Sequence, residues 1–583
     1  MPPAVHVRRC ARALAGALAL LLGAATPAHG AFSGRDGKLT YTAANGRDRA
    51  VTLRNPDGSA PRRLRTGVPA STPVFSPAGR RIAFSGQGRI WVMYADGSAL
   101  RAVTDGLQPA SEPAWSPDGT ALAFAQGAPG ARHIAVVRAD GSGVTTITAG
   151  SGDDRSPAWS ARGIAFVRRT RHGGDELYVT GPLGGRARRL TRTPADEESP
   201  AWSPDGRRIA FSSGRPGSRT VGVIPSAGGR ARTLTAPADD AAAPAWAPDG
   251  RRMALTLRAH GRRRVAIMPA RGGDRRAISP RSVDAGPPDW QPAGAEPVIA
   301  AAGDIACDPT SPDFNGGLGT PSLCHQRQTS DILMTMDLSA VLVLGDAQYS
   351  DGRAGAWSAF DSTWGRLKPL LRPVPGNHEY RDPGASGYYD YFDGAGAANG
   401  PAGARGQGYY SFDVGTWHVV ALNSECSDPP ARNGGVDCSA GSPQERWLRV
   451  DLAAHPATCT LAFWHHPLWS SGISGENGAM YPIWEDLYNA GADVVLNGHD
   501  HAYERLAPQD PGGTRDPVRG IREFVVGTGG RSLQRAVAPA PNSEVRHGSY
   551  GVLQLKLGKG GYRWAFVSEA GVGFTDSGAN ACH

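Results

Sequence analysis

Lysine is nearly absent from this chain of 583 residues. Only four of its 62 basic residues are lysine, and the others are arginine. The formal net charge is +9, yet no block of like charges forms a basic tail. Because arginine stands beside abundant alanine, glycine and proline, coding bias explains the basic excess at least as well as a polyanionic partner does. We find no nucleic-acid-binding motif, so the charge gives no support for that class of function.

A hydrophobic run long enough to span a membrane is also missing. The longest apolar run, residues 13–25, is too short to cross a bilayer comfortably. Three arginines precede it and small residues follow it up to Gly30, which is the order of a secretory signal. We therefore predict a signal peptide over residues 1–30 and a secreted, extracellular or cell-envelope protein. A retained membrane anchor is the alternative.

Cysteine is almost confined to the second half of the chain, and no C-x-x-C pair exists, which argues against a structural zinc site. Six cysteines remain after the signal, an even number that suits disulfides in an exported protein. Two predicted pairs each close a short loop rich in glycine and proline, and the third follows by elimination. The predicted pairs are Cys307–Cys324, Cys426–Cys438 and Cys459–Cys582.

A self-similar phrase, such as Pro113-Ala-Trp-Ser-Pro-Asp-Gly119, recurs through the first half. A chain of this length exceeds one hydrophobic core, so two or three domains are expected. The aromatic residue of the phrase recurs every 40 to 44 residues, so that seven markers enclose six repeats. The markers are Phe32, Phe75, Trp115, Trp159, Trp202, Trp246 and Trp290. A period in the low forties is the length of a propeller blade.

Each repeat has the turns and short apolar runs of four strands. Pro-Asp-Gly favours a tight turn, and runs such as Ile82–Phe84 follow it. The repeats resemble the six-bladed β-propeller of TolB-type proteins, which implies an all-β domain over residues 31–294. We assign its tryptophans to the core. We expect the propeller to be a non-catalytic binding or scaffold module, and the sequence does not identify its partner. After a short linker the period vanishes, and a second domain is predicted over residues 295–583.

The second domain opens with strand, helix and strand. The apolar runs 297–302 and 340–344 end in Gly303-Asp304 and Gly345-Asp346, and residues 325–336 between them can be helical. Such a βαβ unit brings both carboxylates to one edge of a sheet. A further apolar run, residues 494–496, leads into another loop that is rich in histidine.

Three more phrases follow in order: Gly376-Asn-His-Glu379, Trp464-His-His-Pro467 and Gly498-His-Asp-His501. The sequence of aspartate, aspartate, asparagine and three histidines resembles the ligand set of calcineurin-like metallophosphoesterases. That resemblance covers residues 297 to 583. It implies an α/β sandwich of two β-sheets flanked by helices, and a metal-dependent phosphoric ester hydrolase.

The residues around the second aspartate point to one branch of that family. Many members carry a histidine two residues after the first aspartate, where this chain has Ala306. Gly345-Asp-Ala-Gln-Tyr349 instead resembles the motif of purple acid phosphatases, whose tyrosine binds the first metal. By this resemblance Asp304, Asp346, Tyr349 and His501 hold one ion. Asp346 also bridges to a second ion, which takes Asn377, His465 and His499.

The two sites differ in donor chemistry. Two carboxylates and a phenolate suit Fe(III), whereas the site richer in imidazole suits Zn, Mn or Fe(II). The resemblance implies hydrolysis of phosphate esters, phosphomonoesters foremost, by metal-activated hydroxide. His378 is the candidate catalyst, which binds a phosphate oxygen or protonates the leaving group, unless it only orients a ligand. For His466, substrate contact and packing are equally expected. Glu379 is assigned a structural role.

One departure leaves alternatives open. Purple acid phosphatases carry one or two further histidines about nine residues after the ligand that corresponds to His465, and here residues 470–477 contain none. A phosphodiesterase or nucleotidase is therefore an alternative, as is a non-catalytic cell-surface binding protein, although no ligand of the seven is missing. Peptidase chemistry is discounted, because no Gly-x-Ser-x-Gly elbow with suitable partners follows the propeller.

Overall fold

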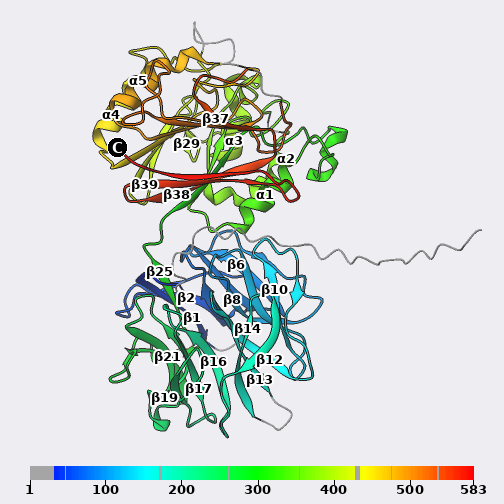
Figure 1. Cartoon of the computed structure of the whole chain (residues 1–583), viewed down its shortest axis with the longest axis vertical. Helices are drawn as coiled ribbons and strands as arrows, with labels where there is room; N and C mark the ends of the chain where they lie inside the picture. The colour runs from blue at the N-terminus through cyan, green and yellow to red at the C-terminus, as the bar shows by residue number, and fades with distance from the viewer. Residues whose placement is uncertain are drawn as a thin grey trace, which may run out of the picture.

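The structure is a computed structural model that describes residues 32–45, 48–169, 174–259, 261–353, 355–426, 434–474, 476–534 and 538–583. An all-β body built from the first half is stacked against a body of mixed strands and helices built from the second (Figure 1). The predicted signal peptide, residues 1–30, lies outside the described residues. Among the described residues, no helix is both long and apolar enough to cross a membrane.

The first body is a six-bladed β-propeller, as the repeats predict. Each blade is a separate antiparallel sheet, and the outermost strand is only two residues long in every blade but the fourth. The blades are β1 (Arg35–Asn45), β2 (Asp48–Arg54) and β3 (Arg62–Arg63); β4 (Ser71–Phe75), β5 (Arg81–Gly86), β6 (Arg89–Tyr94) and β7 (Arg101–Ala102); β8 (Ala110–Trp115), β9 (Ala121–Gln126), β10 (His133–Arg138) and β11 (Thr145–Thr146); β12 (Asp153–Ser160), β13 (Gly163–Arg169), β14 (Asp175–Gly181) and β15 (Gly184–Arg189); β16 (Glu197–Trp202), β17 (Arg208–Ser213), β18 (Thr220–Pro225) and β19 (Arg232–Thr233); β20 (Ala242–Trp246), β21 (Arg252–Ala259), β22 (Arg262–Pro269) and β23 (Arg276–Ala277).

The marker tryptophans join neighbouring blades. Trp115 is 1% exposed, and its indole N–H donates to the carbonyl oxygen of Val74, one blade earlier, at 3.3 Å. Trp202 and Trp246 make the same contact with Ala158 and Ala201 at 3.0 and 3.1 Å. The predicted packing role therefore includes a hydrogen bond across each of these blade junctions.

The ring closes by pairing the two ends of the propeller segment. β24 (Asp284–Ala285) and β25 (Asp289–Ala293) both pair with β1, with Trp290 opposite Leu39. Strands from opposite ends of about 260 residues thus complete one sheet. This closure leaves the first blade without an unpaired inner edge.

The second body contains two mixed sheets that share one core. The six-stranded sheet has the order β28-β27-β26-β38-β39-β40, and the seven-stranded sheet has the order β31-β32-β33-β34-β36-β35-β37. The first sheet is built from β26 (Val298–Ala302), β27 (Ala340–Leu344), β28 (Leu371–Val374), β38 (Gly551–Gly558), β39 (Gly561–Ser568) and β40 (Thr575–Ala581). The second is built from β31 (Tyr410–Val414), β32 (Trp417–Ala421), β33 (Cys459–Phe463), β34 (Val494–Asn497), β35 (Tyr503–Leu506), β36 (Arg522–Val526) and β37 (Ser543–His547), and a separate hairpin pairs β29 (Asn399–Gly400) with β30 (Gly403–Ala404).

Five α-helices accompany the two sheets in the described part of the chain. They are α1 (Gln326–Thr335), α2 (Ser358–Asp361), α3 (Ser386–Phe392), α4 (Pro443–Ala454) and α5 (Tyr481–Asn489). The 3-10 turns are η1 (Pro237–Asp239), η2 (Pro312–Gly317), η3 (Trp364–Leu370), η4 (Glu379–Arg381), η5 (Pro383–Ala385) and η6 (Gly478–Met480). α4 begins at Pro443, because the Ser442 hydroxyl accepts the Glu445 amide and Pro443 occupies the first turn.

Three disulfides join the six cysteines that follow the predicted signal. They are Cys307–Cys324, Cys426–Cys438 and Cys459–Cys582, each with Cα atoms 5.5 Å apart. The pairing is the one predicted from the sequence. The third bond attaches the last strand, β40, to the start of β33 in the other sheet.

The propeller contacts the second body through a charged junction. The Asp337 carboxylate lies 3.5 Å from the buried Arg81 guanidinium and 3.3 Å from the Ala78 amide nitrogen. The Arg80 guanidinium donates to the Asp337 carbonyl at 3.1 Å. Asp337 follows α1, so this junction is connected directly to the βαβ unit of the second body.

Candidate metal centre

The predicted ligands stand just after strands of both sheets. Asp304, Asp346 and Asn377 follow β26, β27 and β28, which are parallel neighbours and therefore end at one edge. His465 follows β33 in the facing sheet, and two histidines follow β34, its parallel neighbour. Three of the ligand candidates have positive φ: Asp304 at 60°, Asp346 at 47° and His499 at 69°. Such strained backbone clusters at functional sites.

An oxygen-rich group forms around Tyr349. Its hydroxyl lies 2.8 Å from Asp304 Oδ1 and 2.8 Å from Asp346 Oδ2. His501 Nε2 is 3.1 Å from the same hydroxyl and 3.2 Å from Asp304 Oδ1. Two carboxylates, a phenol and an imidazole therefore converge on one point, and His501 Nδ1 is anchored by Ser532 Oγ at 2.7 Å.

A nitrogen-rich group lies beside it. His465 Nε2 is 3.2 Å from Asn377 Oδ1, 3.2 Å from His499 Nδ1 and 3.5 Å from Asp346 Oδ1. Asp346 thus contributes one oxygen to each group. The structure brings together all seven side chains that the sequence singles out as ligands.

The donor pattern around His465 fits a cation. Its Nδ1 lies 2.8 Å from the Leu344 carbonyl oxygen, which can only accept, so Nδ1 carries a proton and the neutral ring has its lone pair on Nε2. That lone pair faces the assigned carbonyl oxygen of Asn377 and a carboxylate oxygen of Asp346. The His378 amide donates to the same Asp346 oxygen at 2.9 Å but offers no proton to His465 or Asn377, and a metal ion can satisfy these acceptors together.

Glycine is required next to the ligands because of close packing. A Cβ atom on Gly345 would meet His465 Nδ1 at 2.5 Å, and one on Gly376 would meet Asp346 Oδ1 at 2.4 Å. A Cβ on Gly498 would meet the Leu344 carbonyl oxygen at 2.6 Å. Larger residues at these positions would displace the ligands themselves.

Burial and charge act in opposite directions on the pKa of Asp304. Burial raises it, but His501, by its charge and its hydrogen bond, together with His465 and His499, holds the pKa well below its ordinary value. The pKa of Tyr349 is raised well above its usual range by burial and by the Asp304 and Asp346 carboxylates. A phenol so placed ionises only if positive charge joins the group.

The residues after Asn377 divide into two roles. The His378 ring packs 4.0 Å from the Tyr349 ring, its Nδ1 lies 2.7 Å from the Ser350 carbonyl oxygen, and its Nε2 is 3.8 Å from Asp346 Oδ2. The buried Glu379 carboxylate accepts four backbone N–H groups, from residues 346, 347, 348 and 376. Glu379 therefore ties the Asp346 loop to the Asn377 loop, in line with the structural role assigned from the sequence.

Comparisons with known proteins agree with this arrangement. The family model of the calcineurin-like phosphoesterase matches residues 318–503, and that of the TolB beta propeller domain matches residues 25–171 and 164–303. The chain is a TolB-type propeller joined to a calcineurin-like metallophosphoesterase domain. Six of the seven ligand candidates lie within the matched phosphoesterase range, and Asp304 precedes it.

The phosphoesterase domain is similar to purple acid phosphatases. The chain is 30% identical to purple acid phosphatase 22 of Arabidopsis thaliana over 250 residues, which are 38% of this chain and 52% of that protein. It is 28% identical to acid phosphatase type 7 of Homo sapiens over 258 residues, or 37% and 55% of the two chains. The chain thus spans about half the length of these curated relatives. TolB from Acinetobacter baumannii matches 44% of this chain and 67% of its own, at 21% identity and a TM-score of 0.40.

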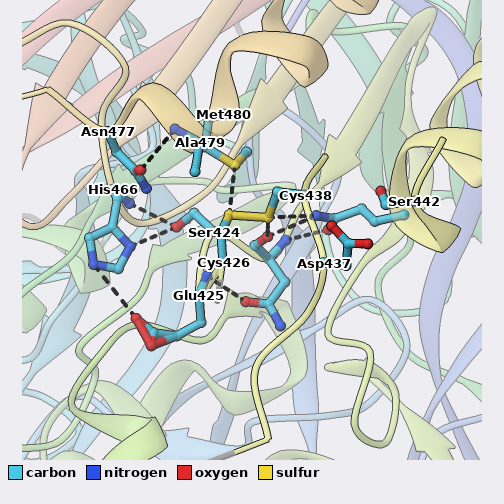
Figure 2. The surroundings of a disulfide bond; sticks show 12 residues. Ser424, Glu425, Cys426, Asp437, Cys438, Ser442, His466, Asn477, Ala479 and Met480 are labelled. Atoms are coloured by element: carbon cyan, nitrogen blue, oxygen red, sulfur yellow. Dashed lines mark hydrogen bonds and ion pairs between the residues drawn. A yellow bond between two sulfur atoms is a disulfide. The ribbon is translucent and has the colours of Figure 1, made fainter. Parts of the chain in front are cut away.

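A loop that the sequence did not mark holds His466 next to the proposed metal ligands of the phosphoesterase domain. Ser424 Oγ lies 2.9 Å from the His466 amide nitrogen and 3.0 Å from its Nδ1, and Glu425 Oε1 lies 3.8 Å from its Nε2. The next residue, Cys426, is bonded to Cys438, so the disulfide fixes this short segment (Figure 2). The His466 ring is 4.3 Å from the His499 ring, which places it against the nitrogen-rich group.

A second missed element of the phosphoesterase domain is the loop after β36. The Arg531 guanidinium lies 5.2 Å from the Tyr349 ring centre, and the Arg531 amide donates to the Asp304 carbonyl at 2.9 Å. The run Gly527-Thr-Gly-Gly530, directly after a buried strand, is the signal that marks this loop. A Cβ on Gly529 would meet the Gly303 carbonyl oxygen at 2.4 Å, so the glycines allow the loop to approach the first aspartate.

Residues 470–477, where purple acid phosphatases have further histidines, have a structural role in this chain. Ser470 Oγ donates to Asp500 Oδ2 and Ser471 Oγ to Glu504 Oε1, both at 2.5 Å. Both carboxylates belong to the stretch around His499 and His501. In this chain the serines therefore hold the histidine loop in place.

Proposed function

We propose that this chain is a secreted two-metal phosphoesterase that hydrolyses phosphate esters, phosphomonoesters foremost. The observation that carries the proposal is the convergence of seven donor side chains into two adjacent groups that share Asp346. A loss of catalysis on this fold is expected to remove ligands, and here each position holds a donor. The matches to purple acid phosphatases support the same reaction class.

The two donor groups suit different ions. Asp304, Asp346, Tyr349 and His501 would hold Fe(III), and Asp346, Asn377, His465 and His499 would hold Zn, Mn or Fe(II). When bound, the ions supply Lewis acidity, which makes water nucleophilic near neutral pH and neutralises the phosphoryl oxygens.

Two histidines of the chain itself are placed to contact the substrate. His378 packs on Tyr349 with Nδ1 fixed by Ser350, so its Nε2 is the atom available to bind a phosphate oxygen or to give a proton to the leaving group. His466 is held on the side of the second group by Ser424, whose Oγ lies 3.0 Å from its Nδ1, and by the Glu425 carboxylate, which lies 3.8 Å from its Nε2. We assign both histidines to substrate contact.

A cavity of about 260 Å³ lies beside His501 and is also lined by Ser471, Gln534, Arg546 and His547. Of the proposed ligands, only His501 reaches it. Phosphomonoesters stand before other substrates in the proposal because the matched relatives are acid phosphatases.

Export and the propeller complete the proposal. Three disulfides suit an oxidising compartment, so we place the protein outside the cell or in the cell envelope. We assign the boundary between the domains to the segment around residue 294, and the propeller to binding or scaffolding, since each proposed ligand follows residue 300.

The test is a substrate panel with the purified, metal-loaded chain: an aryl phosphate, a bis-aryl phosphate, a nucleotide and phytate. We expect the aryl phosphate to be hydrolysed faster than the diester. Asp304→Asn should lose more than about 100-fold in turnover, because changes even in groups that only support metal ligands cost 10- to 100-fold. The matched control is Asp437→Asn, at an exposed position of the same domain, which should keep full activity. A diester preference would favour the phosphodiesterase alternative, and no hydrolysis by the two-metal form would favour the binding protein.

A further inference from the structure

The two domains carry net charges of opposite sign. Residues 31–294 contain 39 basic and 22 acidic residues, which gives the propeller a formal net charge of +17. Residues 295–583 contain 20 basic and 31 acidic residues, a formal net charge of −11. A coding bias toward arginine acts on both halves of one chain alike, so it does not account for the difference in sign. Such a charge asymmetry between domains points to an anionic partner of the basic one.

Most of the positive excess lies in the last part of the propeller. Residues 184–281 contain 20 basic and eight acidic residues, a formal net charge of +12. They form β15 of the fourth blade and the whole of the fifth and sixth blades. In Figure 1, β17, β19 and β21 lie at the end of the molecule opposite the second body. The charge is therefore concentrated far from the phosphoesterase domain.

Arginines of the outer strands link successive blades there. The Arg188 guanidinium in β15 donates to the carbonyl oxygens of Ser226 and Ala227 in the fifth blade, at 2.9 and 3.0 Å. Arg232 in β19 donates in the same way to the Arg271 carbonyl of the sixth blade, at 3.1 Å. Within the described part of the chain, neither guanidinium forms an ion pair. Because a carbonyl acceptor is neutral, both side chains are held in place while their positive charges remain available.

Three further arginines lie beside these links. Arg186 stands two residues before Arg188 in β15, so its side chain lies on the same face of the strand. Arg230 stands two residues before Arg232, and Arg271 carries the carbonyl that Arg232 binds. All three are exposed, and among the described residues their side chains have neither a hydrogen bond nor an ion pair. We call Arg186, Arg188, Arg230, Arg232 and Arg271 the basic rim.

The basic rim has limits on both sides. At the next junction Arg276 donates to the carbonyl oxygens of Pro56 and Asp57 in the first blade, in a turn to which Asp57 also brings a carboxylate. In the third blade the position that corresponds to Arg188 is Thr145, the first residue of β11. The uncompensated arginines are therefore confined to three neighbouring blades, the fourth to the sixth.

The chemistry of the basic rim fits a linear polymer of phosphate groups. Guanidinium groups bind phosphate oxygens with paired N–H donors. Charges repeated from blade to blade match a chain that has an anion in each repeating unit. Among the described residues of the range 184–281, no large apolar or aromatic side chain is exposed. The rim therefore has no apolar anchor for a lipid bilayer and no ring on which a nucleic-acid base could stack.

We propose that the basic rim of the propeller binds a linear phosphate polymer and so attaches the protein to it. The acidic phosphoesterase domain repels such a chain over most of its surface, so the propeller supplies the attraction that the second domain lacks. This inference concerns binding and does not rest on the proposed function.

The experiment measures the binding of fluorescently labelled long-chain polyphosphate to the untagged, full-length protein by fluorescence anisotropy, over a range of salt concentrations. The test variant combines Arg186→Gln with Arg230→Gln, two exposed side chains that hold no other residue in the described structure. The matched control combines Arg89→Gln with Arg138→Gln, which removes the same charge from exposed positions of the second and third blades. Thermal unfolding checks that both variants are folded like the wild type.

We expect the affinity of the wild type to fall as salt rises. In the test variant, binding at low salt should weaken, and the slope of log affinity against log salt should decrease by about two, one for each arginine. The control should keep the wild-type slope. Equal binding by the test and control variants, or a wild type that does not bind polyphosphate, would overturn the proposal. So would competition by inorganic phosphate as strong as that of the polymer, or binding to vesicles of anionic lipid in preference to polyphosphate.

Discussion

Replacing Glu379 by glutamine is expected to destabilise the phosphoesterase domain without touching a proposed ligand. One carboxylate oxygen accepts the amide N–H groups of Asp346 and Gly376 at 2.9 and 2.8 Å, and the other accepts those of Ala347 and Gln348 at 2.9 and 3.3 Å. Burial and the nearby Asp346 carboxylate raise the pKa of Glu379, and these amide donors act in the opposite direction. The side chain is fully buried, so water cannot replace a lost acceptor.

The magnitude follows from the number of donors left without an acceptor. Glutamine keeps one oxygen and turns the other position into an NH₂ group, which cannot accept. Two buried N–H groups then lose their partner, and each costs about 1–3 kcal/mol. The free energy of unfolding of Glu379→Gln should therefore fall by roughly 2–6 kcal/mol.

The assay is denaturant unfolding of the metal-loaded protein, followed by circular dichroism. The matched control is Glu523→Gln, which is equally buried but accepts two long contacts, from the Trp469 amide at 3.5 Å and the Gln509 side-chain amide at 3.4 Å. Because glutamine keeps one acceptor oxygen and the contact that it loses is long, the control should change little. A Glu379→Gln variant within about 1 kcal/mol of the wild type would refute the reasoning, and a stable variant without turnover would assign Glu379 to catalysis instead.

Three further predictions concern other parts of the molecule. Oxidised, iron-loaded protein should be coloured by a phenolate bound to Fe(III), and Tyr349→Phe should be colourless and bind iron more weakly; a coloured variant, read by its visible spectrum, would exclude Tyr349 as a ligand. Burial raises the pKa of Asp289 to about 7, above about 3.9 in the unfolded chain, so the folded state holds the proton more tightly. Propeller stability should therefore fall as pH rises from about 4 to about 7, by at most roughly 4 kcal/mol. Asp289→Asn should flatten this part of the pH profile of the melting temperature, and identical profiles would contradict the assignment. Asp337→Ala leaves the buried Arg81 without its carboxylate and should cost about 3 kcal/mol, with propeller and phosphoesterase domain melting separately by calorimetry; an unchanged single transition would show that the junction does not couple them.

Much of the fold could be predicted because its signals are local and periodic. The marker aromatics gave the number of blades, and the apolar runs ending in Gly-Asp gave β26 and β27. The junction between the domains had no such signal, because Arg81 and Asp337 are 256 residues apart and each is ordinary in its own segment. The closure of the first blade by β24 and β25 likewise depends on strands from the two ends of the propeller.

The residues of the site also fall into those that the sequence predicts and those that it does not. Ligands carried by short motifs at strand ends were found from the sequence, since glycine and the ligand stand side by side there. Ser424, Glu425, Arg531 and Ser532 were missed, because they reach the site from loops whose position depends on a disulfide or on a glycine run from a different strand. The supporting residues of a site follow tertiary packing, so sequence patterns locate them poorly.

The most direct test of the account is a metal titration of the demetallated chain with turnover of an aryl phosphate as readout. Two ions held by one shared carboxylate predict little activity up to the first equivalent, a rise with the second and a plateau at two. Hydrolysis by the metal-free chain, full activity at one equivalent, or two bound ions without hydrolysis would contradict a two-metal phosphoesterase.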